Sequence, residues 1–497
     1  TFPRNLTGSG PNMRMGPGQI PREGIVWLDS TLSHLNNKQI PIIFVNHYPL
    51  DSGLNNWYDA IDKLKKHNVQ LLLNGHWHRN AQLNTEGIPA VVTRSTLRAK
   101  DTVGGYNIVH IHADTATFCV RRPGGSTEAP WANIPLVNHH FIADTTRYAR
   151  PSYSVNKEYP VVTTKWQFTD SSDISSGVAE YRDVLITTNT GGWLMALNKK
   201  DGHLRWKFRT GGKIYSTPGV AGDLVVVAST DKNIYCVNAK TGKLVWKFAT
   251  EKPNVACPLL ADGKVYIGGS DGHFRALDLH SGQLIWDFAQ VKGFMVDRPL
   301  LYGGKLYFGC WANDFYALDA ATGKLCWKWN NGSGNRMYSP AACWPVATDG
   351  RVFIVAPDRK MTALDANTGK VIWRKGDPDR KVRESMGLSC DSQMVYTKTM
   401  QGALCAFSTT ADSMRLVWQP DVALGYEICP TPIFEKDQVV YLPTGSGLVV
   451  AVSRKTSQVL WKYKVSNGLV NSILPLENHT VIVSTMDGKI TCLKIGR

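Results

Sequence analysis

The pattern of apolar and polar positions repeats along this chain from about residue 163 onward. Each unit of about 40 residues holds an alternating apolar run, a glycine-rich turn, a second run ending in Ala-Leu-Asp, a Ser/Thr-Gly turn and a run that carries tryptophan. This alternation, interrupted by turn residues at fixed spacing, predicts short antiparallel β-strands. The repeated aspartate and glycine predict closed hairpins, because aspartate accepts hydrogen bonds from nearby amides and glycine adopts the left-handed conformation. Three units have identical spacing: Ala276-Leu277-Asp278 to Ser281-Gly282 and Trp286, Ala317-Leu318-Asp319 to Thr322-Gly323 and Trp327, and Ala363-Leu364-Asp365 to Thr368-Gly369 and Trp373.

The tryptophan runs indicate how many units there are. Two of the units have Ser408 and Ser453 in place of the aspartate, but their alternating strands persist. Trp166 has no complete unit before it, and the last unit ends at Leu493 without a tryptophan run. Segment 164–168 is therefore predicted to pair with the last unit and close the ring. The sequence predicts an eight-bladed β-propeller over residues 163–497, with one tryptophan in each wedge between sheets: Trp166, Trp206, Trp246, Trp286, Trp327, Trp373, Trp418 and Trp461.

These units resemble the quinoprotein-type propeller repeat, which occurs in pyrroloquinoline-quinone (PQQ) dehydrogenases and in non-enzymatic propellers of bacterial outer-membrane assembly. The resemblance covers residues 163–497 and rests on structural positions, so it implies the fold and leaves the function open. The dehydrogenases carry a vicinal disulfide over the cofactor, whereas this sequence has no Cys-Cys pair. We therefore expect no PQQ. The propeller is then either a recognition or scaffold domain of an enzyme, or a binding module that engages a protein or a glycan.

The first 122 residues have a different pattern, in which helical and strand periodicities alternate as in α/β proteins. Helices are predicted over residues 22–36 and 55–67, and apolar strands over 41–45 and 69–73. The strands run into histidine-bearing loops, Asn46-His47-Tyr48-Pro49 and Asn74-Gly75-His76-Trp77-His78. Proteins of the α/β class place their sites at such strand ends. We expect Gly75 to turn the backbone there, so that His76 and His78 can approach an ion. Neutral imidazoles suit Zn, Fe, Ni or Cu.

Both loops resemble motifs of the calcineurin-like metallophosphoesterase family, whose closing motif Gly-His-x-His is matched by Gly75-His76-Trp77-His78. The resemblance covers about residues 20–125, the C-terminal half of such a domain. It implies that His47 and His76 bind one metal ion and that His78 binds its neighbour. The two divalent ions (Mn, Fe or Zn) would activate a water that attacks a phosphoester. The family's Asp-x-His, Gly-Asp and Gly-Asn-His motifs, which supply the bridging aspartate, do not occur before His47.

We therefore expect the chain to be the C-terminal part of a longer exported phosphoesterase, inactive as given. Its fold class is mainly β, with a partial α/β phosphoesterase domain at residues 1–122 before the propeller at 163–497. Residues 123–162, which contain Gly124-Gly125-Ser126 and several prolines, predict an extended linker. The family resemblance implies a periplasmic or secreted location. The alternative is a non-enzymatic propeller module that engages a protein or a glycan.

Charge and hydropathy narrow the range of partners. The chain has 56 Lys and Arg against 40 Asp and Glu, a net charge of +16. The basic residues form no block, and many occupy turns such as Thr241-Gly242-Lys243, where a solvated position explains them. We therefore expect no nucleic-acid partner. No run of about 18 apolar residues is present, so we also expect no membrane insertion.

Overall fold

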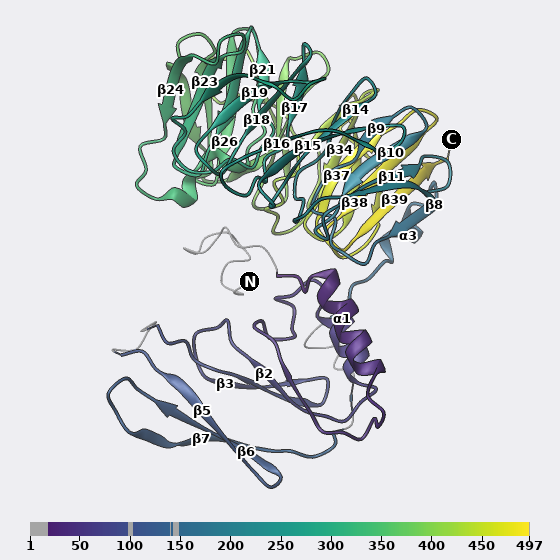
Figure 1. Ribbon diagram of the computed structural model, residues 1–497, viewed down its shortest axis with the longest axis vertical. Coiled ribbons are helices and arrows are strands. Elements are labelled where there is room, and N and C mark those ends of the chain that lie inside the picture. Colours follow the sequence, from purple (N-terminus) through teal and green to yellow (C-terminus); the bar gives the residue numbers. More distant parts are fainter. Residues whose placement is uncertain (1–17, 98–102, 140, 143–148, 497) are drawn as a thin grey trace. The chain divides into compact units, whose positions relative to one another are not determined.

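The computed structural model describes residues 18–97, 103–139, 141–142 and 149–496. Within these residues the chain divides into two compact units, one ending at Ser152 and one starting at Tyr153. Figure 1 shows the helices of the first unit and the many sheets of the second. In this described part of the chain, no helix is long and apolar enough to cross a membrane.

The first unit is built on a four-stranded sheet covered on both faces. Strand order is β1-β2-β4-β3, with β1, β2 and β4 parallel and β3 antiparallel. Leu71 and Leu72 are consecutive on β2, so they point to opposite faces. Leu72 packs under both helices, and Leu71 packs against a second sheet. The elements are α1 (Arg22–Ser33), β1 (Ile42–Val45), α2 (Trp57–Leu64), β2 (Val69–Asn74), β3 (Ala81–Thr85) and β4 (Ile88–Val92).

The second sheet of this unit has three antiparallel strands: β5 (Tyr106–His112), β6 (Thr115–Arg121) and β7 (Thr127–Pro135). Strand β7 lies inside the segment expected to be a linker, and it pairs with β6 along its length. Its Ala132 and Ile134 are buried with Phe118 against the first sheet. Pro130 made this segment look unstructured, but β7 is an edge strand, where proline is tolerated. This part of residues 123–162 therefore belongs to the first unit.

The end of the expected linker is also bound to structure. The guanidinium of Arg150 donates to Asp62 at 2.9 and 3.0 Å and to the buried Glu86 at 3.0 Å. The side-chain hydrogen bond to Asp62, and a weaker one to Glu86, raise the pKa of Arg150. In the second unit, the short helix α3 (Val155–Glu158) contributes Asn156, which accepts from the backbone of Lys464 at 2.7 Å. The segment expected to be an extended tether is thus anchored near Arg150 and again at α3.

Residues 153–496 form eight four-stranded antiparallel sheets, as expected of a propeller. Seven of them consist of four consecutive strands. The sheets are β9 (Ala179–Tyr181), β10 (Val184–Thr188), β11 (Trp193–Asn198) and β12 (Leu204–Arg209); β13 (Gly219–Ala221), β14 (Leu224–Ser229), β15 (Asn233–Asn238) and β16 (Leu244–Ala249); β17 (Leu259–Ala261), β18 (Lys264–Gly268), β19 (Phe274–Asp278) and β20 (Leu284–Phe288); β21 (Leu300–Tyr302), β22 (Lys305–Gly309), β23 (Asp314–Asp319) and β24 (Leu325–Asn330); β25 (Val346–Thr348), β26 (Arg351–Ala356), β27 (Lys360–Asp365) and β28 (Val371–Gly376); β29 (Val382–Leu388), β30 (Met394–Thr399), β31 (Leu404–Ser408) and β32 (Leu416–Trp418); β33 (Phe434–Lys436), β34 (Val439–Pro443), β35 (Leu448–Ser453) and β36 (Val459–Lys464); and β37 (Val470–Pro475), β38 (Thr480–Thr485) and β39 (Lys489–Ile495) with β8 (Val162–Thr169).

The eighth sheet joins the two ends of this unit. Strand β8 pairs antiparallel with β39, and Trp166 lies opposite Cys492. The prediction that segment 164–168 pairs with the last unit is confirmed. Because β8 supplies the outer strand that β37, β38 and β39 lack, the last sheet is completed from the start of the propeller sequence.

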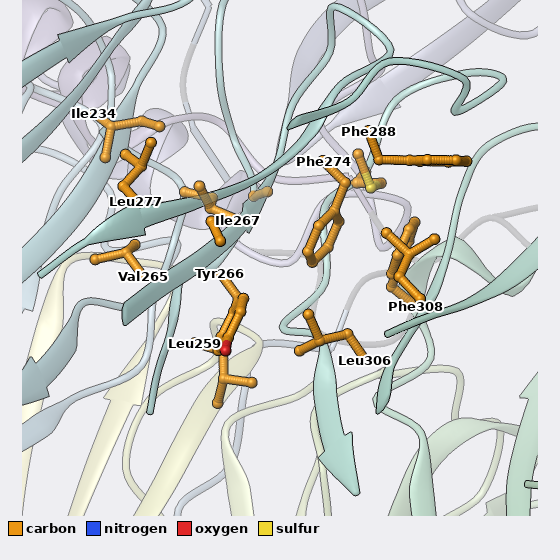
Figure 2. Close-up of a cluster of buried hydrophobic side chains, with 14 of the residues drawn as sticks. Ile234, Leu259, Val265, Tyr266, Ile267, Phe274, Leu277, Phe288, Leu306 and Phe308 are labelled. Carbon is orange, nitrogen blue, oxygen red and sulfur yellow. The ribbon is translucent and has the colours of Figure 1, made fainter. Parts of the chain in front are cut away.

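The core of the second unit lies between neighbouring sheets. Figure 2 shows side chains of β18 and β19 meeting those of β22. The rings of Phe274 and Phe308 are stacked, with centroids 4.2 Å apart. Phe308 in turn stacks on Tyr316, at 5.3 Å. The middle strands of each sheet are buried on both faces, which explains why their sequences are nearly continuous runs of apolar residues.

The repeated tryptophan connects one sheet to a turn of the next. The indole N–H of Trp286 on β20 donates to the carbonyl of Ala320, 3.2 Å away, just after β23 of the following sheet. In that turn, Asp319 accepts from the amide and hydroxyl of Thr322 at 2.8 and 2.7 Å. Gly323 has φ +72°, and a Cβ placed on it would overlap the Trp286 ring. The same indole hydrogen bond to the next sheet is made by Trp166, Trp206, Trp246, Trp327 and Trp373.

Replacement of Gly323 tests this coupling. Gly323→Ala introduces a left-handed alanine, which costs about 1–2 kcal/mol, and an overlap with the indole, which costs about 1–3 kcal/mol more. Gly304→Ala is the matched control, since Gly304 has φ +73° and open space around its Cβ position. We expect denaturant unfolding to show a larger loss of stability for Gly323→Ala than for Gly304→Ala. Equal losses of stability in the two variants would mean that contact with the Trp286 ring does not restrict the residue at position 323.

Candidate functional site

The histidine loops of the first unit are brought together by the parallel pairing of β1 and β2. Val45 lies opposite Leu73, so both strands end at the same edge of the sheet. The amide of Asn46 donates to Leu73 at 3.0 Å, and the amide of Gly75 donates to His47 at 2.9 Å. Pairing thus continues past the strands and holds the His47 loop beside the loop that contains His76.

The imidazoles of His47 and His76 lie close together. Their ring centroids are 5.3 Å apart, in an edge-to-face arrangement. The ring of Tyr48 lies against His76 with a centroid distance of 3.8 Å. Asn74 supports the loop from below, since its side-chain amide donates to the carbonyls of Asn46 and Tyr48 at 3.1 and 3.2 Å. Tyr48 and Asn74 were not among the residues selected from the sequence, although both lie within the two quoted motifs.

The backbone turns at the histidines themselves. His76 has φ 66° and His78 has φ 56°, whereas Gly75 is outside the left-handed region. The prediction that Gly75 makes this turn is wrong, because the hydrogen bond from its amide to His47 continues the parallel pairing through Gly75. Left-handed residues other than glycine are strained, and such strain is concentrated at functional sites.

The third predicted ligand is placed differently. His78 is exposed, whereas His76 is partly buried. Among the described residues, no group of three or more His, Cys, Asp or Glu side chains is arranged to hold a metal ion. The donor set in this part of the chain therefore does not fit the two-ion centre that the family resemblance implies. It leaves the His47 and His76 pair as the part of the predicted site that the fold brings together.

Burial keeps His76 in its neutral form. Desolvation, with smaller contributions from His47 and His78, lowers the pKa of His76 to about 4 from the usual 6.5. An imidazole that is neutral at physiological pH does not repel a cation, and the neutral form is the one that binds metal ions.

The second candidate region is the set of connections that lead from the outer strand of one sheet to the inner strand of the next. They are tied to turns of neighbouring sheets by backbone hydrogen bonds, such as Thr230 to Lys213 at 2.9 Å and Trp311 to Phe294 at 3.0 Å. Their sequences differ from unit to unit, so the repeat pattern does not include them. What distinguishes one connection from another is the kind of side chain that it exposes to solvent.

A buried ion pair also lies on the inner strand β29. Arg383 and Glu384 form an ion pair at 2.6 Å, and both are almost fully buried. Desolvation, together with the charge of Glu384, raises the pKa of the nearby buried Asp297 well above its usual value. The buried Asp297 carboxyl therefore favours its protonated form more than an exposed aspartate does.

Comparison with known proteins identifies the relatives of the second unit. The family model described as outer membrane protein assembly factor BamB matches residues 163–234, 219–336, 292–424 and 408–496. No curated protein sequence matches the chain significantly. Since the family model starts at residue 163, it gives no support to a phosphoesterase domain in the first unit.

Solved structures agree on the fold. BamB from Moraxella catarrhalis is 18% identical, with a TM-score of 0.55 over 67% of this chain and 99% of its own. The computationally designed protein Ika8 is 13% identical, with a TM-score of 0.58 over 67% and 99%. The quinohemoprotein alcohol dehydrogenase ADHIIG from Pseudomonas putida HK5 is 14% identical, with a TM-score of 0.54 over 70% and 78%. At these identities the likeness establishes the propeller fold alone.

Titration of His76 tests the description of the histidine pair. Between its folded pKa of about 4 and the unfolded value of 6.5, the unfolded chain binds a proton that the folded chain does not. The stability that depends on neutral His76 is thus complete above pH 6.5 and is lost as the pH falls toward 4. We expect the ring resonance of His76, assigned by its loss in His76→Gln, to titrate in NMR spectra near pH 4. A midpoint at or above 6.5 would contradict the partly buried, neutral placement of His76.

Proposed function

Because this chain belongs to the family of the outer membrane protein assembly factor BamB, we propose that it is a binding module. Its second unit is, in this proposal, an eight-bladed propeller that engages a partner protein and catalyses no reaction. The observation that carries the proposal is the construction of the connections between sheets. Backbone hydrogen bonds fix them in place, while side chains such as Lys213 and Phe294 face solvent. A rigid surface loses little conformational entropy when a partner binds.

The family also supports a location. Its description names the outer membrane, and we propose that this chain works outside the cytoplasm, in the periplasm or after secretion. The proposal includes no PQQ, since the sequence has no vicinal cysteine pair to place over such a cofactor. A quinone absorption band in the purified protein would contradict that part.

Site-specific photo-crosslinking tests the binding function. A benzophenone amino acid is placed singly at Lys213 and Lys292 in the connections, and at Lys243 and Lys324 in the turns after β15 and β23. The experiment is carried out in cells of the organism that naturally produces the protein. We expect ultraviolet light to yield a defined adduct with another protein from at least one of these two groups of positions. Leu284, on an outer strand, is the control position. The absence of an adduct at every position would overturn the binding module.

A second candidate function concerns the first unit, and the His47–His76 pair favours it. Two imidazoles on one tetrahedral ion, each with a metal–nitrogen distance of about 2.0–2.1 Å, have ring centroids about 5 Å apart. The observed separation of 5.3 Å agrees with that geometry. We propose that the pair can hold one Zn-like ion. In a longer parent protein it would be part of the two-ion phosphoesterase centre, with His78 as ligand of the second ion and a phosphoester as substrate.

Metal titration separates this candidate from a purely structural role. We expect the purified chain to bind about one Zn²⁺ weakly, because two imidazoles without a carboxylate leave a divalent ion poorly neutralised. Calorimetry should show this binding lost in His76→Ala and retained in His203→Ala, which changes an exposed turn histidine. We expect no hydrolysis of p-nitrophenyl phosphodiesters with added Mn²⁺ or Zn²⁺. Unchanged Zn²⁺ binding in His76→Ala would defeat the metal proposal, and turnover lost in that variant would defeat the expected inactivity.

A further inference from the structure

We infer that one half of the connection surface of the second unit is the docking site for an acidic, apolar segment of the partner protein. This half, which we call the cationic connection surface, consists of segments 210–218, 250–258, 289–299 and 331–345. These are the links β12 to β13, β16 to β17, β20 to β21 and β24 to β25. The inference rests on the proposed binding function and assigns it a place and a class of partner.

Charge is the first observation. The four segments contain five basic residues, all exposed, and two acidic ones, of which Asp297 is buried and Glu251 is exposed. The remaining four connections, 170–178, 377–381, 419–433 and 465–469, contain two basic and six acidic residues. The positive charge of this surface is therefore local, and an acidic partner would approach it favourably. The five basic residues are Lys213, Lys252, Lys292, Arg298 and Arg336.

Exposed apolar side chains are the second observation, and they lie in the same half. Tyr215, Phe294 and Met337 are 40%, 43% and 49% exposed. The other four connections contribute no large exposed hydrophobic side chain. Most other large exposed apolar residues of this unit occupy outer strands at recurring positions, as Leu244, Leu284 and Leu325 do. The repeat accounts for those positions, but it does not account for apolar residues on the connections.

The surface around Phe294 contains a hollow, and the Phe294 side chain is fixed in position by its contacts. A hollow of about 620 Å³ is lined by Pro253, Val255, Val291 and Phe294, with Lys252 among its lining residues. Phe294 stacks on Trp311 with ring centroids 5.7 Å apart, and the Trp311 amide donates to the Phe294 carbonyl. Asp271 also lines the hollow, but its fully buried carboxylate is paired with Arg275 at 2.7 Å. Among the residues that line the hollow, Lys252 thus supplies the exposed charge, while the interior suits an aliphatic or aromatic side chain.

The same features favour a protein segment over a nucleic acid. A nucleic-acid strand binds such surfaces by stacking its bases on open aromatic faces. Phe294 already stacks on Trp311, and aliphatic side chains and backbone line much of the hollow. Carboxylates flanking an apolar anchor match a cationic rim around an apolar hollow, with the anchor supplying much of the binding energy.

A peptide titration on the full chain tests the inference. The probe is a fluorescein-labelled acidic peptide of about ten residues with two phenylalanines, which spans roughly 30 Å when extended. Fluorescence anisotropy should show saturable binding that weakens as salt rises. We expect Lys252→Glu with Lys292→Glu to weaken binding about tenfold or more. The matched control is Lys243→Glu with Lys324→Glu, the same charge change in the turns after β15 and β23, and we expect it to remain within about twofold of the wild type.

The apolar part is tested separately. Phe294→Ser should weaken binding of the same peptide, and Leu284→Ser on an outer strand should not. Thermal unfolding shows whether Phe294→Ser folds normally. If it does not, Tyr215→Ser tests the apolar contribution to binding instead, because this variant leaves the Phe294–Trp311 stack intact. A peptide with serine in place of both phenylalanines should bind more weakly than the original.

Three results of the binding measurements would overturn the inference. They are absence of peptide binding by the wild type, equal loss in both charge-reversal pairs, and tighter binding of an oligothymidine strand that is lost in the same variants. Photo-crosslinks found only at Lys243 and Lys324 would also overturn it, while the protein-binding function would stand. Absence of crosslinks at every position would instead remove the proposed function itself.

Discussion

The second unit depends on one contact, repeated from sheet to sheet, between an indole and the turn of the next sheet. Trp286 donates a hydrogen bond to the backbone beyond β23, and its ring covers Gly323 in the same turn. The contact fixes which residues the turn can contain, since the turn needs a left-handed glycine without a side chain. Its Asp319 is occupied in closing the turn around Thr322. These constraints account for the regular spacing of the aspartate, glycine and tryptophan positions.

The constraint acts on one set of turns and leaves the other connections free to vary. The links from outer to inner strands make no indole contact of this kind, and they are held by backbone hydrogen bonds that most side chains permit. Sequence differences can therefore collect there without opening the sheets. These links differ in charge, and some of them carry exposed apolar side chains such as Phe294 and Met337. Binding specificity can therefore reside in the links, while the stability of the sheets does not depend on them.

The sequence was sufficient for features that recur or that follow a simple period. The eight regularly spaced tryptophans, of which Trp166 has no complete unit before it, predicted the pairing of β8 with β39. The helices and parallel strands of the first unit also lie close to their predicted ranges. Features set by tertiary context were missed. Pro130 hid the edge strand β7, and the left-handed turn occurs at His76 instead of Gly75 because the Gly75 amide is bound to His47. The cationic connection surface was missed because its charges lie far apart in sequence and form no motif.

The pairing of β8 with β39 also determines when the ring can close during synthesis. The two strands lie at opposite ends of the propeller sequence, so β8 leaves the ribosome before the other strands of this unit and stays unpaired until β39 appears. Until then β37 and β38 lack their neighbour, and β8 has an unpaired edge that is open to other chains. Bringing such distant segments together is slow, because the chain must lose the entropy of closing a very long loop. A nascent chain of this protein therefore exposes these unpaired edges until β39 has left the ribosome.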